Sequence, residues 1–400
     1  MRIIRKLRYS LKKQRKQLRR LFDKFAQFIA DVLYDRKATL VAKILGTLLL
    51  PLSFVFLLIV KIRVWLYQRR LLYSQSLGCH VIVVGNITMG GTGKTPVAEY
   101  LARLLLAMGR RPAIISRGYK SKSEPIYEKF LRWLTHSPDK PPKVVSDGKN
   151  VLLNSELAGD EPYMLAKNLK GVPVIVDKDR VKAGRYAIKR FGSDVLILDD
   201  GYQYLRLRST LRMVLIDKSN PFGNYYLIPR GILREPLGHL NRASCIFLTK
   251  SNGICDHRLE QKIYNVNYGI QIVECCHQSC HLVSHDGMEI VPLEILQKKN
   301  VAIFCAIASP DGFEQFISSL GANIIYKKRY IDHHRFTNAE LSSINERAKN
   351  ADFLITTEKD SVRIANDFRF NVPFFYMRVR IQFLRNEHWI QHLLSEALAL

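Results

Sequence analysis

A glycine-rich segment between an apolar run and a helical pattern has the composition of a phosphate-binding loop. Residues 85–96 read GNITMGGTGKTP and follow the apolar run VIVV. Glycines let successive backbone N–H groups converge on phosphate oxygens, and the start of a helix adds partial positive charge. Lys94 would reach the β- and γ-phosphates, and the Thr95 hydroxyl would ligate Mg²⁺. The strict pattern has glycine where this chain has Thr88. The candidate nucleotide-binding residues are Gly90, Gly91, Thr92, Gly93, Lys94 and Thr95.

A second acidic element follows about a hundred residues later. Residues 195–201 read VLILDDG, an apolar strand pattern that ends in two aspartates. An acidic side chain at the carboxyl end of a buried strand is placed to hold Mg²⁺ beside a phosphate loop. Asp199 is the first choice as metal ligand, directly or through water, with Asp200 beside it. Taken alone, such residues also cap turns; together with Lys94 and Thr95 they predict a Mg-nucleotide site.

Further motifs go beyond a generic nucleotide-binding protein. Together with GGTGKTP and in this order, they closely resemble the tetraacyldisaccharide 4′-kinase family of P-loop kinases over Val81 to Asp360. The motifs are SRGY (116–119), AGDEP (158–162), DDGYQ (199–203), FGN (222–224), PRGILREP (229–236), DHH (332–334) and TEKD (357–360).

The resemblance implies an activity and a catalytic pair. It implies transfer of the ATP γ-phosphate to the 4′-hydroxyl of a tetraacylated glucosamine disaccharide 1-phosphate in lipid A biosynthesis, with ATP and Mg²⁺. It implies a two-domain cleft at the cytoplasmic face of the bacterial inner membrane. Asp160 matches the family's proposed base and His333 its partner from the second domain; spacing alone leaves His334 equally suitable. The alternative for Asp160 is an N-cap of the following helix, and for His333 a surface turn.

Basic residues must meet the phosphate groups of such a substrate. Arg117 and Arg234 are the candidates for phosphate or nucleotide contacts, because guanidinium offers a bidentate fork. Ordinary ion pairs are the alternative for both. Arg180 in DKDR and Lys359 in TEKD are weaker candidates.

Apolar runs and helical patterns alternate from Val81 onward, which predicts an α/β fold with a doubly wound, mostly parallel sheet. Continuous apolar strands such as VLIL indicate a sheet that is covered on both faces. We expect a basic arm and membrane anchor at residues 1–70, a P-loop kinase domain at 71–240 and a smaller C-terminal α/β domain at 241–400. The expected strands are 81–85, 113–116, 174–177, 195–199, 213–217, 301–307, 353–356 and 374–379. The expected helices are 96–108, 161–168, 180–191, 312–320 and 339–349, with a surface loop at 121–143.

The formal net charge of +27 is concentrated at the start of the chain. Arg2 to Lys37 contains thirteen Lys and Arg against three Asp, and an apolar stretch follows at Ala38 to Val60. Because both flanks of this stretch are basic, a single crossing would export one of them against the positive-inside tendency. We therefore expect a monotopic or re-entrant anchor on anionic lipids rather than a span. Nucleic acid is the rival polyanion, but no nucleic-acid-binding module is visible, and none is expected as a partner.

Two other functions remain open at this point. The crowded Cys275, Cys276, His277, Cys280 and His281 could bind zinc, but no partner pair lies at a fitting distance, and free thiols are the preferred interpretation. A membrane-associated ATPase of the deviant P-loop type that drives a partner protein would share the phosphate loop and the strand-end aspartate.

Overall fold

The structure is a computed structural model that describes residues 28–29, 31–35, 39–118, 140–307, 309–365 and 367–399. Most of the basic arm, Tyr119 of SRGY and residues 121–139 of the expected loop lie outside the described residues. The chain divides into two compact units. The first unit comprises Met1–Tyr73, Ile87–Gly90 and Lys218–Asn241, and the second comprises Ser74–Asn86, Gly91–Asp217 and Arg242–Leu400. The domain boundaries that the sequence suggests, at 70/71 and 240/241, stay predictions.

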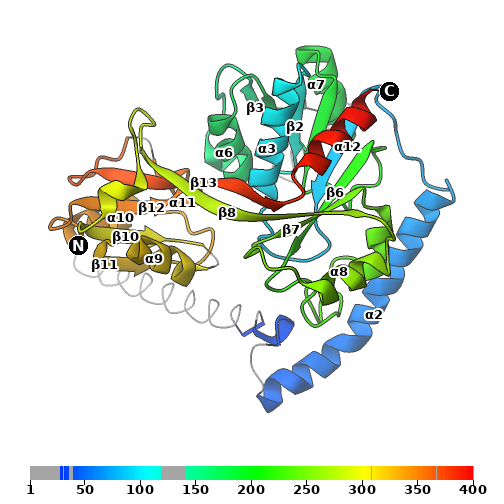
Figure 1. The fold of residues 1–400 in the computed structure, drawn as a ribbon, viewed down its shortest axis with the longest axis horizontal. Helices are drawn as coiled ribbons and strands as arrows, with labels where there is room; N and C mark the ends of the chain where they lie inside the picture. The colour runs from blue at the N-terminus through cyan, green and yellow to red at the C-terminus, as the bar shows by residue number, and fades with distance from the viewer. Residues whose placement is uncertain are drawn as a thin grey trace, which may run out of the picture. The chain divides into compact units, whose positions relative to one another are not determined.

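The first unit is built around one long apolar helix, α2 (Leu40–Gln68), which contains Pro51 (Figure 1). Thr39 caps it, because its side chain accepts a hydrogen bond from the Ala42 N–H. One narrow stripe of α2 packs inside the unit, where the Ser53 hydroxyl donates to the Leu227 carbonyl at 2.7 Å. Many of the other large apolar side chains are exposed; Leu48 and Phe54 have exposed fractions of 67% and 65%. The 3-10 helix η1 (Leu237–Arg242) lies at the end of this unit's last segment.

Among the described residues, thirteen strands form one sheet in the second unit, and most neighbouring pairs are parallel. The order is β11-β10-β12-β13-β8-β7-β6-β1-β5-β2-β4-β3, with β9 paired to β8. The mostly parallel α/β sheet expected from the sequence is confirmed. The strands are β1 (His80–Gly85), β2 (Pro112–Ser116), β3 (Lys143–Asp147), β4 (Pro173–Val176), β5 (Val195–Asp199), β6 (Leu211–Asp217), β7 (Cys245–Thr249), β8 (Gln271–Ser284), β9 (Ile290–Val291), β10 (Asn300–Cys305), β11 (Asn323–Arg329), β12 (Phe353–Thr357) and β13 (Phe374–Arg385).

Helices cover both faces of this sheet. In its first half, Leu101 of α3 and Leu165 of α6 pack with alternate strand residues such as Ile114 and Ile197, and Ile390 of α12 completes the cluster. The Leu196 side chain of β5 lies on the other face, against Gly184 of α7. The helices of the unit are α3 (Lys94–Ala107), α5 (Ser155–Ala158), α6 (Asp160–Asn168), α7 (Arg180–Phe191), α8 (His257–Tyr264), η2 (Leu293–Leu296), α9 (Pro310–Ser319), α10 (Asn338–Arg347), α11 (Glu358–Ser361) and α12 (His388–Leu398).

The second half of the sheet repeats this layering with its own cores. Phe313 and Ile317 of α9 pack on one face of β10, β12 and β13. Leu341 and Ile344 of α10 pack on the opposite face, with Phe304 of β10. This half carries the DHH and TEKD motifs.

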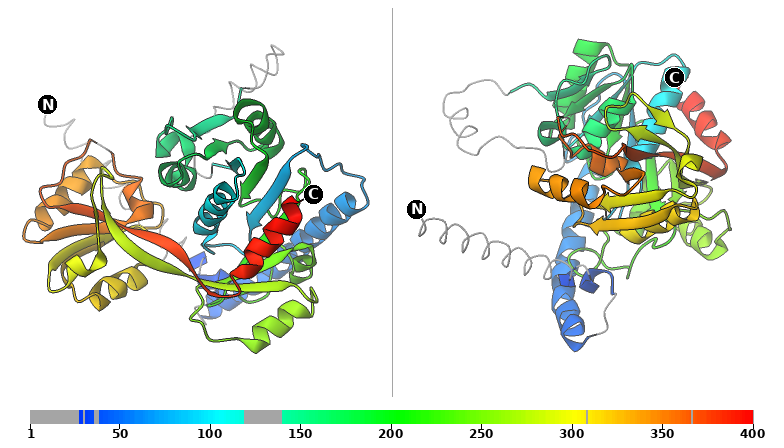
Figure 2. Two further views of the ribbon diagram at one scale, coloured as in Figure 1. Left: turned by 45° about the horizontal axis from the view of Figure 1, so that its top comes forward. Right: turned by 90° about the vertical axis from the view of Figure 1, so that its left-hand side faces the viewer.

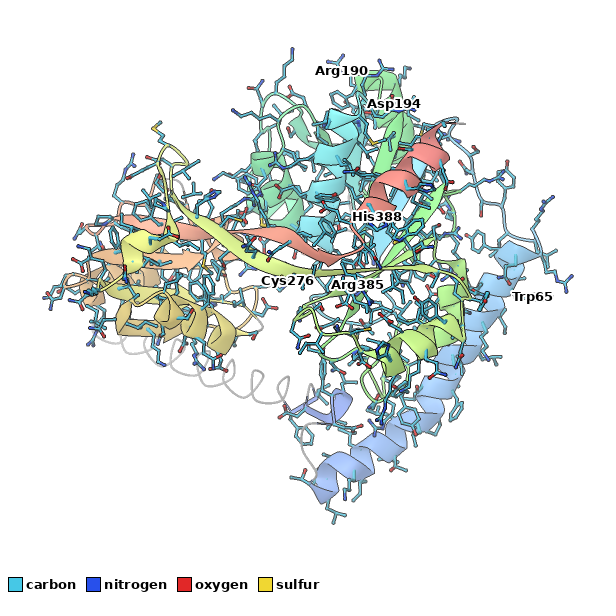
Figure 3. All side chains as sticks on the ribbon, in the orientation of Figure 1. Trp65, Arg190, Asp194, Cys276, Arg385 and His388 are labelled. Atoms are coloured by element: carbon cyan, nitrogen blue, oxygen red, sulfur yellow. The ribbon has the colours of Figure 1, made fainter. Side chains whose placement is uncertain are left out.

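Two long strands join the halves. β8 and β13 pair antiparallel from Phe375↔Ser284 to Arg385↔Glu274 and arch across the unit (Figure 2). Figure 3 marks Cys276 on β8 and Arg385 at the end of β13. The sequence had predicted only residues 374–379 of β13 and none of β8, because both strands alternate polar and apolar residues where they leave the core.

Candidate active site

The phosphate loop runs from the end of β1 to the start of α3. Gly93 takes a left-handed conformation with φ 78° and forms the N-cap of α3, which begins at Lys94. A glycine N-cap offers no side chain to the first N–H groups of the helix, so these donors remain for an anion. Inside the loop, the Asn86 side-chain amide donates to the Thr92 hydroxyl at 3.1 Å. The loop therefore has the features of a phosphate cradle.

Strand order brings the two aspartates to this loop. β1 and β5 are parallel neighbours, with Val84 paired to Asp199, so both strands end at the same edge of the sheet. Asp200 has φ 52°, an uncommon conformation that turns the chain directly after β5. Lys94 Nζ lies 3.4 Å from Asp200 Oδ1. The structure thus brings together residues that the sequence separates by about a hundred positions.

Asp199 has the properties of a metal ligand. It is 5% exposed, and its Oδ1 is buried without a hydrogen-bond partner among the described residues. Burial and the neighbouring Asp200 carboxylate raise the pKa of Asp199 to about 7, against the opposing effect of Lys94. A buried oxygen without a donor is costly unless a cation satisfies it. The donor set of Asp199, Asp200 and Thr95 therefore fits Mg²⁺.

Asp160 lies in a second cluster, at the start of α6. The N-cap of α6 is Gly159, so Asp160 is the first residue of the helix rather than its cap. Its Oδ2 accepts from Arg363 Nε at 2.9 Å and lies 3.3 Å from His333 Nδ1, while Oδ1 accepts from Arg335 at 3.2 Å. Burial opposes ionisation, but the His333 hydrogen bond and the charges of Arg363 and Arg335 outweigh it and lower the pKa of Asp160 to about 2.

Basic groups flank both nitrogens of the His333 ring. Lys359 Nζ lies 3.3 Å from Nε2, and Arg363 Nη2 lies 3.1 Å from Nδ1, which also faces Asp160 Oδ2. His333 has φ 65°, a conformation uncommon for residues other than glycine. Its neighbour His334 instead contacts Glu340 at 3.0 Å and stacks on Tyr330. His333, rather than His334, lies against Asp160.

Acidic and basic residues connect the two clusters. Glu161, next to Asp160, lies 3.7 Å from Lys359 and also contributes to the electrostatic environment of Asp199. Arg180 is buried and lies over the Tyr204 ring at 4.8 Å. Burial and the nearby charge of Arg117 lower the pKa of Arg180, while Asp200 and Asp199 act in the opposite sense. Arg180 and Arg117 thus belong to the surroundings of the strand-end aspartates.

Two predicted residues belong to the first unit. Gly90 has φ 110°, and the loop passes from the first unit to the second between Gly90 and Gly91. Arg234 donates its backbone N–H to the Ile87 carbonyl at 2.7 Å within the first unit. A role for the Arg234 side chain in nucleotide binding stays a prediction.

Sequence reasoning missed Arg335 and Arg363. Arg335 directly follows DHH and Arg363 lies three residues after the end of TEKD, but neither spacing indicates that both guanidinium groups meet Asp160. The proximity of each arginine to a family motif is the one signal that could have drawn attention to them.

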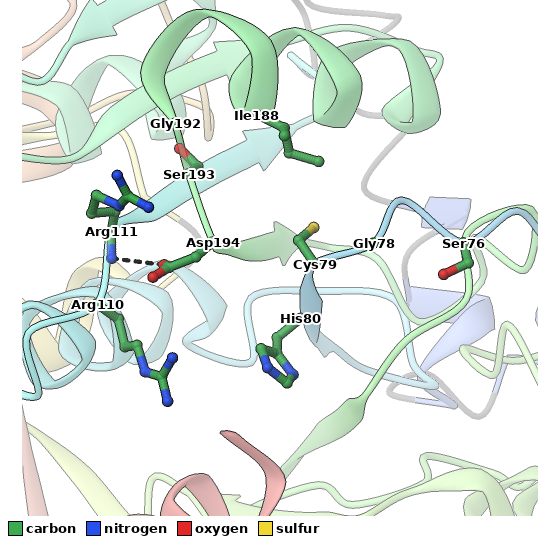
Figure 4. A pocket seen from close by; sticks show the side chains of 10 residues that line it. All are labelled: Ser76, Gly78, Cys79, His80, Arg110, Arg111, Ile188, Gly192, Ser193 and Asp194. Atoms are coloured by element: carbon green, nitrogen blue, oxygen red, sulfur yellow. Dashed lines mark hydrogen bonds between the residues drawn. The ribbon is translucent and has the colours of Figure 1, made fainter. Parts of the chain in front are cut away.

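A hollow elsewhere in the second unit contains none of the predicted site residues. It has a volume of about 620 Å³ and lies where β1, β2 and β5 begin (Figure 4). Arg110, Arg111, His80 and Asp194 line it, and the Arg111 N–H donates to Asp194 at 2.7 Å. Ligands of parallel α/β sheets bind at the opposite edge, where the strands end. We therefore place the active site at the phosphate loop.

One cluster of cysteine, histidine and glutamate side chains contacts a guanidinium group. All seven cysteines lie among the described residues, and each is free. Cys255, His257 and Glu260 lie close enough to share an ion. Arg385, however, pairs with Glu260 and donates to Cys255 Sγ at 3.3 Å, so a guanidinium already supplies the positive charge.

Comparison with known families decides the relationship of this chain. A family model described as tetraacyldisaccharide-1-P 4′-kinase matches residues 45–398. The chain belongs to this family. The tetraacyldisaccharide 4′-kinase of Syntrophus aciditrophicus (strain SB) is 36% identical over 341 residues, covering 82% of this chain and 87% of that protein. The corresponding kinase of Desulfotalea psychrophila (strain LSv54) is 38% identical, covering 82% and 91%.

The fold of this chain also matches a solved structure of the same family. The crystal structure of LpxK from Aquifex aeolicus, in a complex with ATP, superposes with a TM-score of 0.70 and 29% identity. The superposition covers 88% of this chain and 99% of the LpxK chain. The chain is therefore a kinase, as the motifs predicted, and the ATPase alternative is not favoured.

Proposed function

We propose that this kinase transfers the γ-phosphoryl group of ATP to the 4′-hydroxyl of a tetraacylated glucosamine disaccharide 1-phosphate, a step of lipid A biosynthesis. The observation that carries the proposal is the pairing of Asp160 with His333 in the unit that also holds Lys94 and Asp199. A nucleotide-binding protein that only hydrolyses ATP has no need for this pair.

The reaction needs a proton acceptor, and Asp160 is the candidate. The hydroxyl oxygen of the acceptor forms a bond to the γ-phosphorus and loses its proton to Asp160. The bond from that phosphorus to the β,γ-bridging oxygen breaks, and ADP leaves with the electron pair. A carboxylate with a pKa of about 2 is a weak base. It therefore takes the proton late, when the new O–P bond has acidified the hydroxyl, as a loose transition state permits.

Other residues of the chain bind and orient. Lys94 and the N–H groups at the start of α3 are placed to hold the β- and γ-phosphates, and His333 orients Asp160 through its contact with Oδ2. Thr95, Asp199 and Asp200 would hold Mg²⁺, which supplies charge neutralisation on the phosphate oxygens when it is bound. Arg117 and Arg234 are proposed as further phosphate contacts.

We also propose where in the cell the reaction occurs. Helix α2 is long and apolar enough to cross a membrane, and 11% of its most apolar window is buried. Basic residues on both sides support a monotopic anchor on anionic lipids at the cytoplasmic face of the bacterial inner membrane. The proposed division into a kinase domain and a C-terminal domain at residue 241 would couple closure to the meeting of Asp160 and His333.

The decisive experiment is the identification of the product. Purified full-length protein is incubated with Mg-ATP and a tetraacylated disaccharide 1-phosphate, and the lipid is analysed by mass spectrometry and phosphorus NMR. We expect one added phosphate, at the 4′ position, and none with Lys94→Ala. ATP hydrolysis that proceeds equally without lipid, and without a phosphorylated lipid, would contradict the proposal.

A further inference from the structure

Two arginines hold the Asp160 carboxylate, and their environments differ. The Arg363 side chain has an exposed fraction of 0%, whereas that of Arg335 is 39%. Both come from the half of the sheet that carries DHH and TEKD, while Asp160 comes from the half that carries the phosphate loop. Both guanidinium groups thus contact the same carboxylate, but the Arg335 side chain has more freedom to move than the Arg363 side chain.

Arg363 is fixed by contacts in several directions. Nη1 donates to Asp360 Oδ1 at 2.7 Å and to the Ala306 carbonyl at 3.1 Å. Nε donates to Asp160 Oδ2 at 2.9 Å, and Nη2 lies 3.1 Å from His333 Nδ1. Asp360 is itself held, because Oδ2 accepts from the Ala306 N–H at 2.9 Å and from the Thr357 hydroxyl at 2.7 Å. A planar fork that is bound along its whole edge fixes the orientation of the groups it contacts.

Arg335 has fewer anchors. Besides Asp160 Oδ1, its contacts are the Ser155 carbonyl at 3.1 Å and the Ser155 hydroxyl at 3.4 Å. The Arg335 guanidinium reaches solvent, so water can replace its hydrogen bonds when it moves away. Arg335 can therefore leave Asp160 at little cost, whereas Arg363 cannot.

To transfer its proton, the acceptor hydroxyl has to reach one oxygen of the Asp160 carboxylate. Oδ2 already accepts from Arg363 and lies against the His333 ring, so the acceptor hydroxyl has to approach Oδ1, which Arg335 contacts. We propose that Arg363 is a positioning residue that fixes Asp160 and His333 for the transfer, and that Arg335 holds Oδ1 until the acceptor hydroxyl displaces it. This inference rests on the proposed role of Asp160 as proton acceptor.

Steady-state kinetics of the full-length protein with Mg-ATP and the lipid disaccharide separate the two roles. Arg363→Gln is expected to lower kcat about 100-fold, the loss typical of a misplacement by about 1 Å. Arg363→Lys keeps the charge but loses the fork, so it should restore only part of kcat. Arg335→Gln should instead lower the KM for the acceptor about two- to fivefold. Arg347→Gln, at an exposed arginine in the last turn of α10, is the matched control and should behave as the wild type.

The effect of Arg363→Gln on kcat has to be separated from its effect on folding stability. Arg363→Gln leaves Asp360 buried beside an uncharged partner, so the double variant Asp360→Asn, Arg363→Gln removes both charges. Its melting temperature should return toward that of the wild type, while its kcat stays low. Recovery of wild-type kcat in the double variant or in Arg363→Lys would overturn the positioning role. A higher acceptor KM in Arg335→Gln would overturn displacement, since Arg335 would then bind the acceptor.

The same assay distinguishes this inference from the proposed function. Wild-type protein that makes no phosphorylated lipid, or Asp160→Asn with wild-type kcat, would refute the proposed function. A wild-type enzyme that depends on Asp160 but tolerates loss of Arg363 would refute only the positioning role.

Discussion

His333 Nδ1 lies 3.3 Å from Asp160 Oδ2, although 173 residues separate them in the chain. Lys359 lies on the other side of the imidazole, 3.3 Å from Nε2, and Arg363 lies 3.1 Å from Nδ1. Asp160 is therefore held by two arginines and contacts the imidazole. This relationship makes the role of Asp160 testable.

Asp160→Asn should lower kcat at least 100-fold and leave the affinity for ATP within about threefold, because removal of a proton acceptor typically costs 10²–10⁴-fold. The measurements are lipid phosphorylation and binding of a fluorescent ATP analogue. The pKa of Asp160 is lowered to about 2, so its ion pairs stabilise the fold above about pH 4, and this contribution is lost as the pH falls toward 2. Unchanged turnover would exclude Asp160 as the base.

Binding of the Mg-nucleotide should weaken below pH 7. Asp199 has a pKa of about 7 because it is buried beside Asp200, and Mg²⁺ binds its ionised form. Each pH unit below 7 should then cost about tenfold in affinity, since a proton must be displaced. Calorimetric titration between pH 5.5 and 8 measures this. Because the folded-state pKa is raised, Asp199 also lowers stability as the pH rises from about 4 to 7 in metal-free protein. Asp199→Asn should bind weakly at all pH values, and a persisting slope in this variant would assign the effect elsewhere.

Gly93→Ala should disrupt the phosphate loop. Gly93 has φ 78°, and a Cβ there would lie 2.6 Å from Nε2 of His277. We expect at least a tenfold loss of ATP affinity, because both the backbone conformation and the imidazole would have to change. Gly238→Ala is the control, since nothing lies within 4 Å of its Cβ position. Equal ATP binding by Gly93→Ala and wild type would show that the loop does not need this conformation.

Arg378 of β13 should be essential for stability. It donates to Glu99 of α3 and Glu358 of α11, and the Asn168 amide at the end of α6 contacts both glutamates. Arg378→Met would leave Glu358 without its guanidinium partner and Glu99 with Arg103 alone, in a site where all three charged side chains are at most 8% exposed, at a cost of about 3–5 kcal/mol. Urea unfolding measures this loss.

A triple variant is the control for this network. Adding Glu99→Gln and Glu358→Gln to Arg378→Met removes the buried charges together, so stability should recover in large part. A triple variant less stable than Arg378→Met would mean that packing, rather than uncompensated charge, explains the loss.

Binding to the membrane should depend on the exposed side of α2. Leu48→Glu with Phe54→Glu places two charges on that side and should abolish flotation with anionic vesicles. Removal of residues 1–70 should do the same. Tyr268→Glu, at a side chain with an exposed fraction of 97%, is the control. Continued flotation of the double variant would locate the anchor elsewhere.

The local chemistry of the phosphate loop could be predicted from the sequence. Lys94, Thr95 and their glycines are contiguous, and their function depends on the backbone of one loop, so a short pattern suffices to predict it. β5 was predicted with its observed bounds because a strand buried on both faces is continuously apolar. β7 escaped prediction despite being equally buried. β8 and β13 carry polar side chains along much of their length, so their full extent escaped prediction as well.

Contacts between residues far apart in the chain follow from the fold and could not be predicted from the sequence. The parallel pairing of β1 with β5 brings Asp199 and Asp200 to Lys94. The segments after β11 and β12 carry His333, Arg335 and Arg363 to Asp160, and no local spacing encodes this convergence. The sequence shows that an arginine is charged but not which group it pairs with. In the structure, burial and several hydrogen bonds fix the Arg363 side chain, whereas the Arg335 side chain is more exposed and has fewer contacts.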